Sequence, residues 1–364
     1  MLRHAFDTLG LAEIHEQPTA AAETLSYWRA QVDSGDGELL FDALLQHVER
    51  VVIVGVGTSY HAGLAGRLAI ERWARIPVDV EVASDFRYRD PILAPRTLVL
   101  GISESGETAD TLAAMQLARE RGAIAVAVTN VPGSPAMQQS HAALFTRVRP
   151  EAAAAATRTF VAQVVLLYAF ALRLAEIRSS QSPTALSDLR SALELLSGQM
   201  ASLLASAAST VKVVAERLAK CPFFLFLGGD CGLPVALEGA LKLKEIAYVP
   251  TDTHRTGEMM DDLVALLSPE TPVICVATEE AVLPQLLCNL SEVRARRARV
   301  IAVAGRGAAQ IKEHADEVIY VPRADPVLQI PLAVIPLQLL AHHVARHRGL
   351  NVGPTEHLTG TIAA

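Results

Sequence analysis

One segment of the sequence determines the fold class. It is Thr97-Leu98-Val99-Leu100-Gly101-Ile102-Ser103-Glu104-Ser105-Gly106-Glu107-Thr108-Ala109-Asp110-Thr111-Leu112. Its first six residues form an apolar run typical of a buried strand, and its end predicts a helix that begins near Ala109. A turn rich in hydroxyl groups joins the two. A strand followed by a turn and a helix is the unit from which α/β proteins with parallel sheets are built.

The turn has the composition of an anion-binding loop. Ser103, Ser105 and Thr108 supply hydroxyl donors, Gly106 lets the backbone approach a ligand, and the first amides of the helix point toward the same spot. The turn lacks the lysine of a nucleotide P-loop and the glycines of a dinucleotide fingerprint. These residues leave two interpretations open, a phosphate site and an ordinary Ser/Thr helix cap with an acidic first turn.

The sequence contains two copies of one unit. Three chain-breaking residues recur at a constant shift of 173 residues: Gly55 and Gly228, Gly66 and Gly239, Pro77 and Pro250. Each copy predicts strand, helix, strand, helix, strand, and right-handed crossovers then give a doubly wound parallel sheet with a ligand crevice at the carboxyl ends of its strands. The predicted fold class is therefore α/β, with two tandem doubly wound parallel sheets.

The order of segments along the chain predicts the domains. We expect a helical lead-in over 1–41, a first sheet domain over 42–181, a helical linker over 182–208, a second sheet domain over 209–348 and a tail over 349–364. In the second copy, residues 278–282 replace the hydroxyl-rich turn with two acids and few donors. One phosphate site per chain is the expected count.

Composition excludes several classes of partner. The net charge of −7 and the absence of a Lys/Arg run argue against nucleic acid. The N-terminus has no apolar signal core, and the apolar stretch over 161–174 is shorter than a membrane span, so we expect a cytoplasmic protein without a membrane partner. The four cysteines form no CxxC pair, and neither a metal nor a cofactor is expected.

A second charged pattern lies in residues 237–246. Glu238, Lys242 and Glu245 are spaced at i, i+4 and i+7, which places them on one face of a helix. Such a stripe is ordinarily a solvated salt-bridged face. Because this helix begins beside the predicted crevice, a functional face is the alternative.

Several short segments together resemble a known family, the double sugar-isomerase (SIS) domain proteins, and most closely the isomerase half of glucosamine-6-phosphate synthase. The resemblance covers nearly the whole chain. The matching segments are residues 16–18, 57–60, 83–89, 105–112, 129–134, 236–246 and 335–341.

The resemblance implies roles for particular residues. It implies that the phosphate of a hexose phosphate such as fructose 6-phosphate is held by one further serine and by the hydroxyls of the turn over 103–108, here called the phosphate turn. It also implies that the protein is a homodimer. It also implies that a glutamate is the base that moves a proton between C1 and C2 of the open-chain sugar, with a lysine setting the charge around it. The phosphate-binding positions are Ser59, Ser103, Glu104, Ser105 and Thr108, where Glu104 replaces a family glutamine, and the catalytic positions are Glu245 and Lys242.

Two family residues are replaced here. The ring-opening histidine of the family corresponds to Asp261, and the tail lysine corresponds to Gly360. Asp261 near Glu245 would let one carboxyl act as acid and the other as base. His254 and His357 are the candidates to take over ring opening.

Three functions follow from these residues. The first is an enzyme that interconverts ketose and (amino)aldose 6-phosphates by C1–C2 proton transfer. The second is a phosphosugar-binding or regulatory protein that has lost catalysis with the histidine and the lysine. The third is a synthase subunit fed by a separate glutaminase, because the first cysteine is Cys221 and glutamine-dependent synthesis by this chain alone is not expected.

Overall fold

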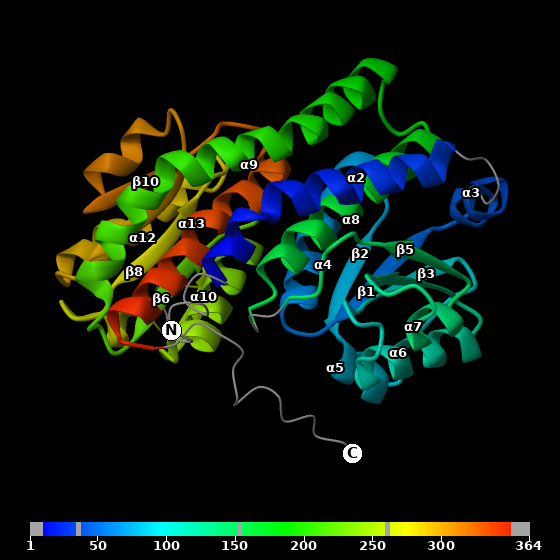
Figure 1. The fold of residues 1–364 in the computed structure, drawn as a ribbon, viewed down its shortest axis with the longest axis horizontal. Helices are drawn as coiled ribbons and strands as arrows, with labels where there is room; N and C mark the ends of the chain where they lie inside the picture. Colours follow the sequence, from blue (N-terminus) through cyan, green and yellow to red (C-terminus); the bar gives the residue numbers. More distant parts are fainter. Residues whose placement is uncertain (1–9, 34–37, 152–154, 259–262, 351–364) are drawn as a thin grey trace. The chain divides into compact units, whose positions relative to one another are not determined.

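A computed structural model describes residues 10–33, 38–151, 155–258 and 263–350. The chain divides into two compact units. The first domain contains Thr19–Arg149 and Arg158–Ser197, and the second contains Met1–Pro18, Pro150–Thr157 and Gly198–Ala364. Figure 1 shows a strand-and-helix layer structure in each unit.

The first domain is built on a parallel sheet of five strands in the order β2-β1-β3-β4-β5. The central strands are continuous Val/Ile/Leu/Ala runs with every or nearly every residue buried, as expected when helices cover both faces. The strands are β1 (Arg50–Gly55), β2 (Val78–Val82), β3 (Thr97–Ile102), β4 (Ile124–Thr129) and β5 (Ala142–Phe145).

Helices cover both faces of this sheet. In Figure 1, α5, α6 and α7 lie below the sheet, α8 lies above it, and α4 lies to the left of β1 and β2. The helical elements are α2 (Gln17–Asp33), α3 (Glu38–Gln46), α4 (Thr58–Ala69), the π-helix Ile70–Ala74, α5 (Ala83–Tyr88), α6 (Ala109–Glu120), α7 (Pro135–Gln138) and α8 (Thr157–Ile177). The 36-residue α9 (Pro183–Leu218) then continues into the second domain.

The second domain repeats the same topology. Its parallel strands have the order β10-β9-β8-β6-β7, which is the order of the first sheet counted from β6. This is the flavodoxin-like order of a doubly wound sheet, so the predicted fold class and the internal duplication are confirmed. The elements are β6 (Phe224–Gly228), α10 (Gly232–Ala247), β7 (Thr251–Arg255), η2 (Leu263–Leu266), β8 (Val273–Ala277), α12 (Leu283–Ala295), β9 (Val300–Gly305), η3 (Ala309–Glu313), β10 (Glu317–Val321) and α13 (Pro326–His347).

The glycines that recur in the sequence have the same packing role in both domains. A Cβ atom added to Gly66 in α4 would lie 2.8 Å from a side-chain carbon of Leu167 in α8. One added to Gly239 in α10 would lie 2.5 Å from a side-chain carbon of Leu337 in α13. Each glycine therefore lets the first helix of its unit approach the long apolar helix closely.

The two long apolar helices also bear on the membrane prediction. By length and composition, α8 and α13 could each cross a membrane. Helix α8 has 21 residues and includes the apolar stretch over 161–174, which was expected from the sequence to be shorter than a membrane span. Their most apolar windows are 83% and 100% buried inside the structure. Such burial is typical of helices in a protein core.

Candidate functional site

The hydroxyl-rich turn begins where β3 ends, at the carboxyl edge of the first sheet. The helix that follows starts at Ala109, as the sequence predicts, with Thr108 as its N-cap residue. In an open parallel sheet, the crevice beyond the carboxyl ends of the strands is where ligands bind. The turn therefore lies at the expected edge, and the amide dipoles of α6 are directed toward it.

Ser103 is the centre of the turn. It is 2% exposed, and its Oγ lies 2.8 Å from Oγ1 of Thr108. The same oxygen accepts hydrogen bonds from the backbone amides of Gly106, at 3.1 Å, and Thr108, at 3.4 Å. Ser105 Oγ accepts from the amide of Glu107 at 3.2 Å. These bonds hold the hydroxyl groups and amides of the turn in one compact arrangement.

Gly106 is required by the shape of the turn. Its φ is +70°, a left-handed conformation that side chains disfavour, and an added Cβ would lie 2.3 Å from Oγ of Ser134. The Gly106 carbonyl accepts a hydrogen bond from the amide of Ala136 at 3.0 Å, which ties the turn to α7. The turn is therefore fixed on two sides before any ligand arrives.

Glu104 adds a carboxylate to the same turn. Burial raises the pKa of the Glu104 carboxyl, and a hydrogen bond from Nδ2 of Asn130, at 3.4 Å, offsets part of that rise. The backbone carbonyl of Glu104 accepts from the amide of Asn130 at 2.9 Å and from the hydroxyl of Thr129 at 3.1 Å. The side chain is thus half-buried against the end of β4.

Ser59 lies at the start of α4, on the turn that follows β1. Its hydroxyl accepts a hydrogen bond from Nε2 of Gln163, in α8, at 3.2 Å. Gln163 was not predicted as a site residue, because an apolar helix with a single glutamine has no recognisable motif. The structure nevertheless identifies Gln163 as the side chain that orients Ser59.

The charged residues of α10 are not a solvated stripe. Glu238 and Lys242 are fully buried, and Glu245 is 26% exposed. Lys242 Nζ lies 2.6 Å from Oε2 of Glu245 and 3.3 Å from Oε1 of Glu238. The three side chains therefore share one helix face, as the spacing predicts, with the ammonium between two carboxylates.

A backbone carbonyl completes the surroundings of the ammonium. Lys242 Nζ donates to the carbonyl of Ala155 at 2.5 Å. Burial lowers the pKa of Lys242, but Glu238 and Glu245 more than offset it, so its pKa lies above the ordinary 10.5. Lys242 is consequently a permanent cation that fixes the position of the Glu245 carboxylate.

Of the two histidines that are candidates for ring opening, only His254 lies within the described residues. His254 lies in β7, the edge strand of the second sheet, where its Nε2 is 3.0 Å from Oδ2 of Asp252. Asp261, His357 and Gly360 lie outside the described residues.

Among the described residues, one group of possible metal ligands is gathered. The ligand atoms of Asp230, Cys231 and Glu279 lie within 4.8 Å of one another. The backbone amide of Cys231 already donates to Oε2 of Glu279 at 3.3 Å, and a metal there would need a deprotonated thiol. The donor set is explained by this local hydrogen bonding.

The fold and the two arrangements together define a class: tandem doubly wound α/β units with a hydroxyl-rich turn after the third strand of the first and a buried lysine on the first helix of the second. The chain belongs to the SIS domain family, whose model matches residues 44–173 and 218–348.

Two curated relatives that align with nearly the whole chain share one name. The chain is 39% identical over 361 residues to glutamine–fructose-6-phosphate aminotransferase [isomerizing] of Chlorobaculum tepidum, and 42% identical over 359 residues to the protein of that name from Mycolicibacterium paratuberculosis. The alignments cover 98% and 97% of this chain but only 58% and 57% of the relatives. The chain thus spans little more than half their length.

A solved structure matches over almost its full length. The C-terminal domain of glucosamine-fructose-6-phosphate aminotransferase from Francisella tularensis superposes with a TM-score of 0.85 at 31% identity, covering 95% of this chain and 98% of that one. The similarity therefore extends across both SIS domains.

Proposed function

We propose that this protein is a phosphosugar isomerase that interconverts ketose and (amino)aldose 6-phosphates, with Glu245 as the base. In the reaction Glu245 removes a proton from C1 of the open-chain ketose 6-phosphate, which gives an enediolate. The proton of the C1 hydroxyl then moves to the C2 oxygen, and Glu245 returns its proton to C2, which gives the aldose 6-phosphate. With ammonia as a second substrate, the amine would add to the C2 carbonyl with loss of water, and the same C1-to-C2 proton transfer in the resulting imine would give an amino hexose phosphate.

One observation carries the proposal: a half-buried carboxylate is held by a fully buried ammonium. Lys242 fixes Glu245 at 2.6 Å, and Glu238 and the Ala155 carbonyl fix Lys242 in turn. A base that is oriented before the substrate arrives needs little rearrangement to reach a carbon-bound proton. This arrangement favours an enzyme over a protein that only binds sugar phosphates, because binding alone does not require an oriented base.

The turn after β3 supports the same substrate class. Ser59, Ser103, Ser105 and Thr108 offer hydroxyl groups, and α6 offers its N-terminal amides, for a phosphate dianion. The relatives' names add fructose 6-phosphate as the candidate ketose. We therefore assign the 6-phosphate of the sugar to this turn.

The test is proton NMR of the purified protein in heavy water with fructose 6-phosphate and with glucosamine 6-phosphate, with and without ammonium. Wild-type protein should exchange or interconvert the C1 and C2 protons. Glu245→Gln should abolish this, because the amide cannot accept the proton. Lys244→Gln is the matched control, since Lys244 is an exposed residue of the same helix.

Exchange that persists in Glu245→Gln would contradict the role of Glu245. Silence of the wild-type protein on both sugars, with binding demonstrated by a shift in melting temperature, would instead favour a regulatory phosphosugar-binding protein. His254→Ala, measured in the same assay, tests whether this histidine opens the sugar ring. Unchanged turnover from the cyclic sugar would remove it as a candidate.

We also propose that the active form is a cytoplasmic homodimer without nucleic-acid or membrane partners. The net charge of −7 and the SIS relatives support this assignment. Light scattering during size-exclusion chromatography would measure the mass directly. A monomer that turns over the substrate would contradict the proposal.

A further inference from the structure

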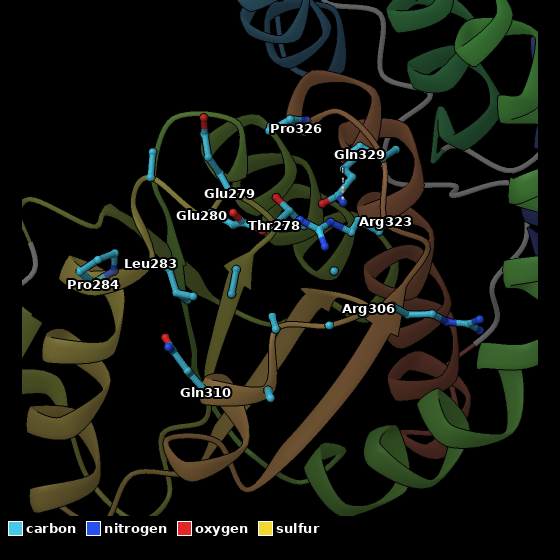
Figure 2. A pocket seen from close by; sticks show the side chains of 17 residues that line it. Thr278, Glu279, Glu280, Leu283, Pro284, Arg306, Gln310, Arg323, Pro326 and Gln329 are labelled. Atoms are coloured by element: carbon cyan, nitrogen blue, oxygen red, sulfur yellow. Dashed lines mark hydrogen bonds and ion pairs between the residues drawn. The ribbon is translucent and has the colours of Figure 1, made fainter.

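The second sheet has a cavity at its carboxyl edge, in the position that the phosphate turn occupies on the first sheet. Its volume is about 650 Å³. Residues that follow β8, β9 and β10 line it (Figure 2). Because the two sheets have the same strand order, this is the equivalent ligand crevice of the second unit.

Two buried polar groups in this cavity lack partners among the described residues. Gln329 is 2% exposed; its Nε2 donates to the carbonyl of Ala324 at 3.2 Å, while its Oε1 accepts no hydrogen bond. Thr278 is 8% exposed, and its Oγ1 likewise has no partner within the described part of the chain. Leaving such groups unsatisfied is unfavourable, which favours a ligand that bonds to them.

The backbone makes room for the amide. A Cβ atom on Gly305 would lie 3.2 Å from Nε2 and 3.4 Å from Oε1 of Gln329, so glycine at the end of β9 leaves space at this point. Figure 2 shows the side chains of Thr278, Arg323 and Gln329 among those that line the pocket. Since Nε2 is committed to Ala324, the amide presents an acceptor, and the complementary ligand group is a hydroxyl or an amine.

The charges of the lining argue against a phosphate. Arg306 and Arg323 are matched by Glu279 and Glu280, and Arg323 Nη2 lies 2.9 Å from Oε1 of Glu280. A dianion would meet two carboxylates here without the several hydroxyl groups that the turn after β3 offers. The remaining lining is largely apolar, including Ala281, Leu283 and Pro326, which suits the C–H faces of a sugar ring.

We propose that this cavity is a second binding site, for an uncharged sugar-like polyol whose hydroxyl groups bond to Gln329 Oε1 and Thr278 Oγ1. The site is separate from the phosphosugar site, and the inference does not rest on the proposed catalytic activity. It gives the second copy of the duplicated unit a ligand of a different chemical class from that of the first.

Saturation-transfer NMR with glucose and with N-acetylglucosamine, at millimolar concentration, tests the proposal on the whole chain. At least one sugar should bind saturably to the wild-type protein. Gln329→Leu and Thr278→Val should each weaken that binding by about tenfold, the effect of losing one hydrogen bond. Gln116→Leu makes the same amide-to-alkyl change on an exposed helix of the first domain, and it should leave binding unchanged.

Thermal unfolding identifies a variant that fails to fold, and the other variant then carries the test. Ser103→Ala should retain sugar binding, because it alters only the turn after β3. The proposal is overturned if neither sugar binds, if the folded Gln329 and Thr278 variants bind like the wild type, or if Ser103→Ala removes binding.

Discussion

Ser103 makes three hydrogen-bonding contacts within the turn after β3. Its hydroxyl joins Thr108 Oγ1 and the amides of Gly106 and Thr108 in one hydrogen-bonded arrangement. Under the proposed function, the same hydroxyl that positions the turn would also donate to the phosphate. Loss of that hydroxyl is expected to affect both order and binding.

We expect Ser103→Ala to weaken the binding of fructose 6-phosphate by tenfold or more and to lower the free energy of unfolding by about 1–2 kcal/mol, because buried amides lose their acceptor. Isothermal titration and urea unfolding measure the two effects. Ser191→Ala, at an exposed position in α9, is the control. Equal affinities of Ser103→Ala and the wild type would remove Ser103 from the site.

Lys242 is the residue whose replacement should be most damaging to stability. Lys242→Met would leave the buried Glu238 carboxylate without its ammonium, a change expected to cost about 3–5 kcal/mol. Adding Glu238→Gln to Lys242→Met should recover part of that loss, because the buried charge is removed as well. Urea unfolding of the single and double variants measures the recovery, and a double variant no more stable than Lys242→Met would contradict this account.

The sequence predicted this cluster only in part. The i, i+4, i+7 spacing placed the three side chains on one face, since helical geometry alone determines that. Their burial could not be read from the spacing, because it depends on how the remainder of the domain covers α10. The Ala155 carbonyl was also not predictable, since a backbone group has no sequence signature and lies 87 residues away.

At the scale of elements, helix packing explains the recurrent glycines. Gly239→Ala would gain about 1 kcal/mol of helix propensity but would force its Cβ to within 2.5 Å of Leu337. Overpacking of this kind costs about 1–3 kcal/mol, so we expect a net loss of stability. Thermal or urea unfolding of the variant is the measurement.

Gly198→Ala is the matched control for this prediction. Gly198 also lies within a helix, α9, but an added Cβ would meet nothing within 4 Å. The substitution should therefore stabilise the protein by about 0.5–1 kcal/mol. Opposite signs for the two alanine variants would support the packing role of Gly239, whereas stabilisation by both would contradict it.

The elements themselves were predictable because the two signals that define them are local. Apolar runs identified the buried strands, and glycine or proline identified the ends of the first helices in both copies. The π-helix Ile70–Ala74 at the end of α4 was not predicted. A change from the α-helical to the π-helical hydrogen-bonding pattern depends on packing and has no residue signature in this stretch.

At the scale of the molecule, two adjacent histidines of α13 should make stability dependent on pH. Burial and the neighbouring His343 lower the pKa of His342 to about 3, and burial and Lys212 lower that of His343 to about 4. The rings are 5.3 Å apart, and His342 is fully buried. Both imidazoles are therefore neutral in the folded protein at pH values where they are protonated in the unfolded chain.

The folded-state pKa values lie below the ordinary 6.5 of the unfolded chain. The contribution of the two neutral histidines to the free energy of unfolding is therefore fully present above pH 6.5 and decreases as the pH drops toward 4. At about pH 5.5 each histidine should cost about 1.4 kcal/mol relative to about pH 7.5. Urea unfolding at the two pH values measures this loss. His342→Leu should remove about half of it. His47→Gln, at an exposed position directly after α3, is the control for a histidine-to-neutral substitution.

The duplicated architecture was the most predictable feature of the whole chain, because three breakers at one shift required two similar units. The side chains that line the ligand crevice of each copy were less predictable. The two acids and few donors of residues 278–282 predicted no second phosphate turn. The buried Gln329 could not be predicted to line this edge, because it lies about 50 residues further on and only the fold brings it there.

The shared strand order has a consequence for how the chain reaches its native state. During refolding each strand meets two sheets of the same topology, and a strand that joins the wrong one finds neighbours at equivalent positions. Parallel sheets depend on long-range pairing and form slowly, which prolongs the exposure of unpaired edges. Synthesis from the ribosome lets the first sheet close before the second emerges, so renaturation of the complete chain should be the more error-prone route.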